Sequence, residues 1–156
     1  MIIDAQSVKN TDTGCLSGYD AGKKIKGIKR HIAVDTNGLP HAIYITSSSS
    51  TDRDGAILMF EKHIQNMTIL EKVLVDGGYT GEKFANKIRE LSGATVEVVK
   101  RSELHKFKVI PKRWIVERSF SWLEKCKRLH KNSEKTQSSA LAMIQLVFIR
   151  LLLNRL

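Results

Sequence analysis

Cysteine is scarce in this sequence of 156 residues, and long hydrophobic runs are absent. Cys15 and Cys126 are far apart and fit no Cys-x-x-Cys or Cys/His spacing, which argues against a disulfide framework or a structural zinc site. The most apolar stretch, 140–153, is interrupted by Gln145 and Arg150 and is shorter than the roughly 20 residues of a membrane span. The first residues carry no secretory signal pattern. These absences predict a soluble protein of the reducing cytoplasm.

Acidic residues are also few relative to basic ones. The sequence has 26 Lys and Arg against 16 Asp and Glu, which gives a formal net charge of +10. Such a balance favours a polyanionic partner such as nucleic acid, although ribosomal and membrane-surface proteins share it. With 42% hydrophobic residues, the chain has the length and composition for one core, so we expect a single domain over residues 1–156.

The hydrophobic pattern predicts strands and helices that alternate along most of the chain. Asn37-Gly38 lies between two β-rich runs and is a strong signal for a hairpin. Asn10–Gly22 is expected to be a loop, followed by a basic, glycine-interrupted run over Lys23–Lys29. The predicted strands are 1–8, 30–35, 40–46, 72–76 and 95–99, and the predicted helices are 56–64, 82–91, 112–131 and 137–156. This order indicates a mixed α/β domain.

Two aspartates lie on predicted strands. Asp76 ends a buried-type strand directly before Gly77-Gly78, and Asp4 lies in the first strand. Ligands of open α/β sheets bind at the carboxyl edge of the strands, and hard divalent cations need converging carboxylates. A turn-forming or capping role for Asp76 and a solvated position for Asp4 remain open on this evidence.

Glu117 is less clear, because the long predicted helix places it on a polar face. Arg113, Ser121, Glu124 and Arg128 share that face. The opposite, mostly apolar side contains Ile115, Val116, Ser119, Phe120, Trp122, Leu123 and Cys126. A solvated face with surface ion pairs is the alternative to a metal-binding role.

Seven short motifs resemble, in the same order, those of insertion-sequence transposases. They are IDAQSVK at 3–9, GYDAGKK at 18–24, KRH at 29–31, VDTNG at 34–38, DRDGA at 52–56, DGGY at 76–79 and RWIVERSFSWL at 113–123. The sequence is similar to the catalytic domain of DDE-type bacterial transposases, in the insertion-sequence-five-like branch of the larger insertion-sequence-four-like group. This resemblance implies a ribonuclease-H-like fold, also called retroviral-integrase-like, with a mixed central sheet flanked by helices.

The resemblance also implies a catalytic triad. It falls on Asp4, Asp76 and Glu117, which would hold Mg²⁺, with Mn²⁺ able to substitute. Arg113 matches the Arg that precedes the catalytic Glu in the family's Tyr-Arg-Glu-Lys signature. Glu124 stands where that signature has Lys, so Lys125 or Arg128 is expected to contact DNA phosphate instead.

Other residues are candidates for DNA contact. The basic run offers phosphate contacts, with a solvated loop as the alternative. Trp114 lies near the polar face of its helix and could stack on unpaired bases, whereas Trp122 is expected in the core. His31 and His63 show no ligand spacing and are assigned no chemistry. The basic-run candidates are Lys23, Lys24, Lys26, Lys29 and Arg30.

The function implied by the resemblance is metal-dependent cleavage of element ends and transfer of the freed 3′-hydroxyl into target DNA. A stand-alone nuclease of the same fold and a non-catalytic DNA-binding remnant are the alternatives. Transposases of this kind carry an N-terminal region that helps to recognise element ends, and we expect it to be absent here. We also expect a bacterial, nucleoid-associated protein that forms at least a homodimer when two ends are brought together.

Overall fold

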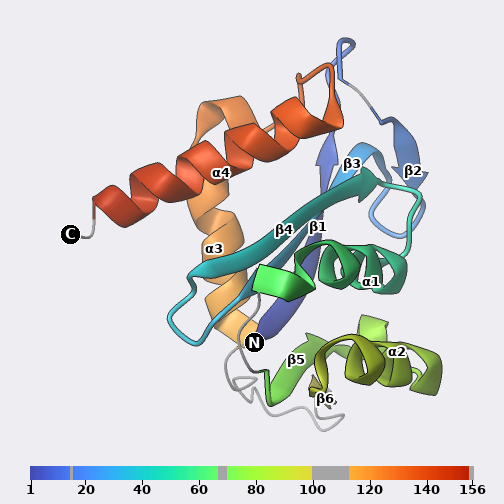
Figure 1. Ribbon diagram of the computed structural model, residues 1–156. Coiled ribbons are helices and arrows are strands. Elements are labelled where there is room, and N and C mark those ends of the chain that lie inside the picture. The colour runs from blue at the N-terminus through green and yellow to red at the C-terminus, as the bar shows by residue number, and fades with distance from the viewer. Residues whose placement is uncertain (15, 67–69, 100–112, 155–156) are drawn as a thin grey trace, which may run out of the picture.

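The computed structural model describes residues 1–154 apart from 15, 67–69 and 100–112, and it shows a mixed sheet with helices on both faces (Figure 1). The strands are β1 (Ile2–Lys9), β2 (Gly18–Asp20), β3 (Ile25–Val34), β4 (Pro40–Ser47), β5 (Lys72–Asp76) and β6 (Thr95–Val99). The helices are α1 (Asp52–His63), α2 (Glu82–Ser92), α3 (Arg113–Glu124) and α4 (Gln137–Leu153), with short 3₁₀ turns η1 (Ile64–Asn66), η2 (Gly77–Tyr79) and η3 (Lys127–Leu129). This is the ribonuclease-H-like, mixed α/β architecture that the sequence predicts.

The pairing of the strands changes from antiparallel to parallel at β1. Its strand order is β2-β3-β1-β5-β6, and β4 also pairs with β3. The strands β2, β3, β4 and β1 are joined by antiparallel pairings, whereas β1 pairs in parallel with β5 and β5 with β6. Strand β1 therefore lies between an antiparallel meander and a parallel pair, although these strands are far apart in sequence.

Each face of the sheet is covered by its own pair of helices. Helices α3 and α4 pack on one face around Ile2, Ile32 and Leu123, and α1 and α2 pack on the other around Ile3, Phe60 and Ile88. Since successive side chains of a strand point to opposite faces, even-numbered residues of β1 face α3. In the described part of the chain, no helix is both long enough and apolar enough to cross a membrane.

The meander is larger than the sequence predicts. Strand β3 begins at Ile25, so most of the predicted basic run is strand, and the predicted loop over Asn10–Gly22 contains β2. Gly27 permits this extension, because a Cβ at that position would lie 2.1 Å from the carbonyl oxygen of Val8. The charge pattern of the run gives no information on this close approach of two backbones, so the extension of the strand could not be predicted from it.

Two helix boundaries also differ from the prediction. Helix α1 begins at Asp52, four residues before the predicted start, because the Thr51 hydroxyl accepts a hydrogen bond from the N–H of Asp54. Helix α3 ends at Glu124 and not at Lys131. The following turn directs the Leu129 carbonyl towards a buried side chain of β3, and a continuous helix would not do so. The predicted helix opening at Pro111 lies outside the described residues.

Candidate active site

Asp4 and Asp76 lie side by side on neighbouring parallel strands. The parallel register pairs Ile2 of β1 with Leu74 of β5, and each aspartate is two residues further along its strand. Ile2 and Leu74 both pack on the side of α3, so the aspartates two residues further along lie on the same face of the sheet. Both line one small cavity, whose remaining walls are Ile2, Ile3, Leu74, Val75, Val99 and Val116.

Local hydrogen bonds orient both aspartates. One oxygen of Asp4 accepts a hydrogen bond from the N–H of Ala5 at 2.8 Å. One oxygen of Asp76 accepts from the N–H of Gly78 at 2.9 Å, which caps the turn η2. Asp76 thus has the capping role that the sequence left open.

Glu117 lies on the helix above this cavity. Its neighbour Val116 lines the cavity, and the Glu117 side chain is exposed. Two helical turns later, Glu124 accepts a hydrogen bond from the Gln6 amide of β1 at 2.7 Å. Residues seven apart share one helix stripe, so Glu117 is on the flank of α3 that faces β1.

The three predicted carboxylates are not gathered into one metal-binding cluster. Among the described residues, no three His, Cys, Asp or Glu side chains are arranged closely enough to hold a metal ion. The structure brings Asp4 and Asp76 together and leaves Glu117 on the flank of the covering helix. Their assignment as metal ligands stays a prediction.

Two of the predicted DNA contacts are buried. Lys29 and Arg30 have only 5% and 2% of their surface exposed, so in this structure neither side chain is available to a DNA phosphate. Arg30 donates a hydrogen bond to the Leu129 carbonyl at 2.9 Å, and burial lowers the pKa of its guanidinium to about 10. The prediction treated a basic run as a surface, whereas this part of it lies inside the sheet.

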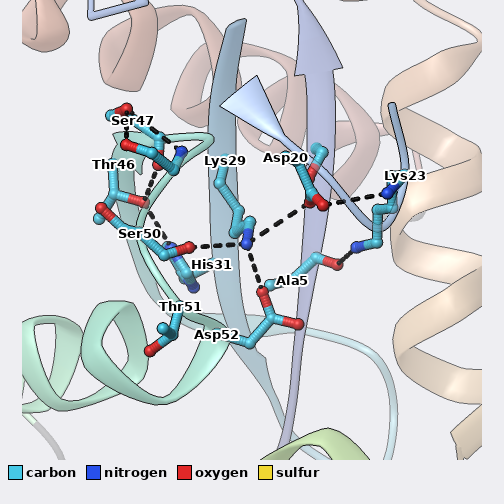
Figure 2. A network of polar contacts seen from close by, with 12 residues as sticks. Ala5, Asp20, Lys23, Lys29, His31, Thr46, Ser47, Ser50, Thr51 and Asp52 are labelled. Atoms are coloured by element: carbon cyan, nitrogen blue, oxygen red, sulfur yellow. Dashed lines mark hydrogen bonds and ion pairs between the residues drawn. The ribbon is translucent and has the colours of Figure 1, made fainter. Parts of the chain in front are cut away.

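Lys29 belongs to a buried polar network between the sheet and the start of α1 (Figure 2). Its ammonium lies 2.8 Å from an Asp52 oxygen and 3.6 Å from an Asp20 oxygen, and it donates to the Ser50 carbonyl at 2.7 Å. Burial would raise the pKa of Asp20, but hydrogen bonds from the Ser7 hydroxyl and a backbone N–H, together with the Lys29 charge, lower it. The network joins β1, β2, β3 and α1.

His31 lies beside this network with a structural role. Its Nε2 atom is 2.9 Å from the Thr46 hydroxyl, and the ring is fully buried. Helix α1 approaches so closely that a Cβ on Gly55 would lie 2.1 Å from the ring. Burial lowers the pKa of His31 to about 4, partly opposed by the charge of Asp52, so the ring is neutral at pH 7.

The remaining basic candidates are divided between surface and partnered positions. Lys24, Lys26 and Lys125 are exposed, and Arg128 is paired with Glu134 at 2.9 Å. The exposed Lys23 donates to the Ala5 carbonyl at 3.2 Å. The side chain of Arg113 lies outside the described residues.

Sequence reasoning missed Arg118, which lies between the two tryptophans of α3. Its guanidinium carbon is 4.7 Å from the ring centroid of Trp114 and 4.9 Å from that of Trp122. Trp114 is 49% exposed, and Trp122, expected in the core, is only half-buried. The spacing of four residues on either side of Arg118 was the signal that could have revealed this arrangement.

The ribonuclease-H-like sheet with two strand carboxylates at one cavity agrees with the class of domain that the sequence resembles. The family model of the transposase DDE domain matches residues 1–152, and the chain therefore belongs to this family. Members generally use divalent metal ions.

A relative from Burkholderia cepacia is named "Putative transposase for insertion sequence element IS402". It is 27% identical over 116 residues, which are 70% of this chain and 54% of the relative. The chain thus spans about half the length of this curated relative.

Proposed function

We propose that this chain is the catalytic domain of a DNA transposase that cleaves the ends of its element and joins the 3′-hydroxyl to target DNA. The observation that carries the proposal is that Asp4 and Asp76 line one cavity from adjacent parallel strands beneath α3, in a chain of the transposase DDE domain family. In the first step water attacks phosphorus and frees a 3′-hydroxyl. In the second that hydroxyl attacks a target phosphodiester, whose own 3′-oxygen leaves.

The paired carboxylates fit a hard divalent cation such as Mg²⁺ or Mn²⁺, because both offer oxygen ligands at one cavity. A bound ion would polarise the attacking oxygen and stabilise the leaving one. Asp4 and Asp76 would hold it, and Glu117, on the flank of α3 that faces β1, would complete the set by turning towards the cavity.

The experiment that tests this function is a strand-transfer assay with pre-cut element ends, plasmid target and Mn²⁺. We expect covalent joining of the ends to the plasmid, since both steps use the same attack on phosphorus. Hydrolysis without joining would indicate a nuclease of the same fold. Binding without either product would indicate a non-catalytic remnant, and a repeat with Mg²⁺ would exclude an effect of the chosen metal.

Exposed lysines near β2 are proposed to bind DNA phosphates. Lys24 and Lys26 project from the turn and strand that follow β2, in a chain of net charge +10. We expect the double change Lys24→Gln and Lys26→Gln to weaken binding of all duplexes alike. The slope of log affinity against log salt should fall by about 0.9 for each phosphate that the protein no longer neutralises, which filter binding at several salt concentrations measures.

The matched control is Lys62→Gln with Lys83→Gln, which removes the same charge from exposed positions on α1 and α2. This control should leave the salt slope nearly unchanged. Equal slopes for the two double variants would contradict the assignment and would show that net charge alone attracts the DNA.

A further inference from the structure

The two tryptophans of the sequence enclose one arginine. Trp114, Arg118 and Trp122 form a stripe along α3, and the Arg118 guanidinium lies within 5 Å of both ring centroids, at 4.7 and 4.9 Å. A guanidinium over indole rings is attracted by their negative faces and loses conformational freedom between them. Arg118 is therefore held in one direction.

That direction is towards the turn of the β3–β4 hairpin. Arg118 donates a hydrogen bond to the carbonyl of Asn37 at 3.0 Å, and Ser119 donates to the carbonyl of Gly38 at 3.2 Å. A Cβ on Gly38 would lie only 3.2 Å from a guanidinium nitrogen. The turn itself is fixed by Asp35, whose carboxylate accepts two backbone N–H groups. Helix α3 is thus anchored to a rigid turn.

The anchor and the carboxylate lie on opposite flanks of the same helix. The buried residues Ile115, Val116 and Ser119 face the sheet. With 3.6 residues per turn, the stripe of Arg118 lies on one side of this buried face and the stripe of Glu117 on the other. A rotation of α3 about its axis would therefore change the distance from Glu117 to Asp4 and Asp76, and the hairpin contact opposes that rotation.

We propose that Arg118 is a positioning residue, which sets the rotation of α3 through the hairpin turn and so places Glu117 relative to the paired aspartates. The inference rests on the proposed function, because it assumes that Glu117 joins Asp4 and Asp76 in binding a divalent ion. In this role Arg118 would contact neither the ion nor DNA. Its role would be visible as an altered metal affinity and not simply as a loss of stability.

The test is a Mn²⁺ titration followed by tryptophan fluorescence, with the intact chain and no DNA. Both tryptophans contact Arg118, and Trp114 is three residues from Glu117, so bound Mn²⁺ should quench the emission. We expect Arg118→Gln to raise the Mn²⁺ concentration at half-quenching about tenfold. Arg118→Lys keeps a cation and a donor and should recover most of the shift. The control Arg89→Gln removes a charge from the exposed face of α2 and should leave the midpoint unchanged.

Thermal melts show which variants are folded, and Gly38→Ala offers an approach from the other partner if Arg118→Gln does not fold. Gly38 has a φ of +84° beside Arg118, so an added methyl should displace the same contact and raise the midpoint as well. If Asp76→Asn raises the midpoint but the folded Arg118 and Gly38 variants leave it within twofold of the wild-type value, the positioning role alone would be overturned. Quenching that Asp76→Asn does not affect would instead contradict the metal site, and with it both proposals.

Discussion

Asp76→Asn is expected to lower metal-dependent cleavage by more than about 100-fold while leaving the affinity for duplex DNA within about twofold. Substitution of residues that only support metal ligands typically lowers metal affinity or activity by about 10–100-fold. Substitution of a proposed ligand should have a larger effect. The amide oxygen of Asn can still accept the hydrogen bond from the Gly78 N–H, so the turn η2 should persist. Gel assays of cleavage, with binding measured separately, check both halves of the prediction.

The matched control is Asp12→Asn, which makes the same chemical change at an exposed loop position. It should cleave at the wild-type rate. If Asp76→Asn also cleaved at that rate with Mg²⁺ or Mn²⁺, the proposed mechanism would be wrong. A drop in DNA affinity equal to the drop in rate would mean that Asp76 supports the DNA-binding surface and not the chemistry.

The positions of the two aspartates on strands could be anticipated because their causes are local. The run 73–75 is apolar and contains two β-branched valines, and Asp76 follows it directly before Gly77-Gly78, which predicts a buried strand with Asp76 at its end. The short apolar start predicts a strand that carries Asp4. What the pattern could not supply is the parallel register of Ile2 with Leu74, because pairing between distant strands depends on the whole sheet.

The course of the basic run could not be predicted for a different reason. Lys29 and Arg30 look like a charged surface, yet β3 lies between β1 on one side and β2 and β4 on the other. Their charges are accommodated by partners from remote segments, namely Asp20, Asp52 and the Leu129 carbonyl. Residues so distant in sequence carry no periodic signal that links them.

The place of Glu117 shows the limit of helix periodicity. The pattern of α3 correctly separates buried Ile115, Val116 and Phe120 from the polar positions. It cannot state which flank meets β1 and which meets the hairpin, since both flanks carry charged residues. That distinction comes from two contacts, of Glu124 with Gln6 and of Arg118 with Asn37.

The buried network predicts the largest effect on stability. We expect Lys29→Met to lower the free energy of unfolding by about 3–5 kcal/mol, because it removes the cation shared by the largely buried Asp20 and the partly buried Asp52. Urea denaturation followed by circular dichroism measures the change. If the variant does not fold, Asp52→Asn removes one charge but keeps an oxygen that can accept from Lys29, and a smaller decrease should be measurable.

The control for this prediction is Lys72→Met, because Lys72 also forms an ion pair with a carboxylate but does so at an exposed position. Lys72 forms an ion pair with Glu97 at 2.8 Å, the same distance as that between Lys29 and Asp52. The side chains of both Lys72 and Glu97, however, are more than half exposed. Exposed pairs typically contribute about 0–1 kcal/mol, since water and salt screen them. Lys72→Met should therefore change the unfolding free energy little. A decrease at Lys29 no greater than that at Lys72 would show that water reaches the network and that Asp20 and Asp52 do not depend on Lys29 for their charge.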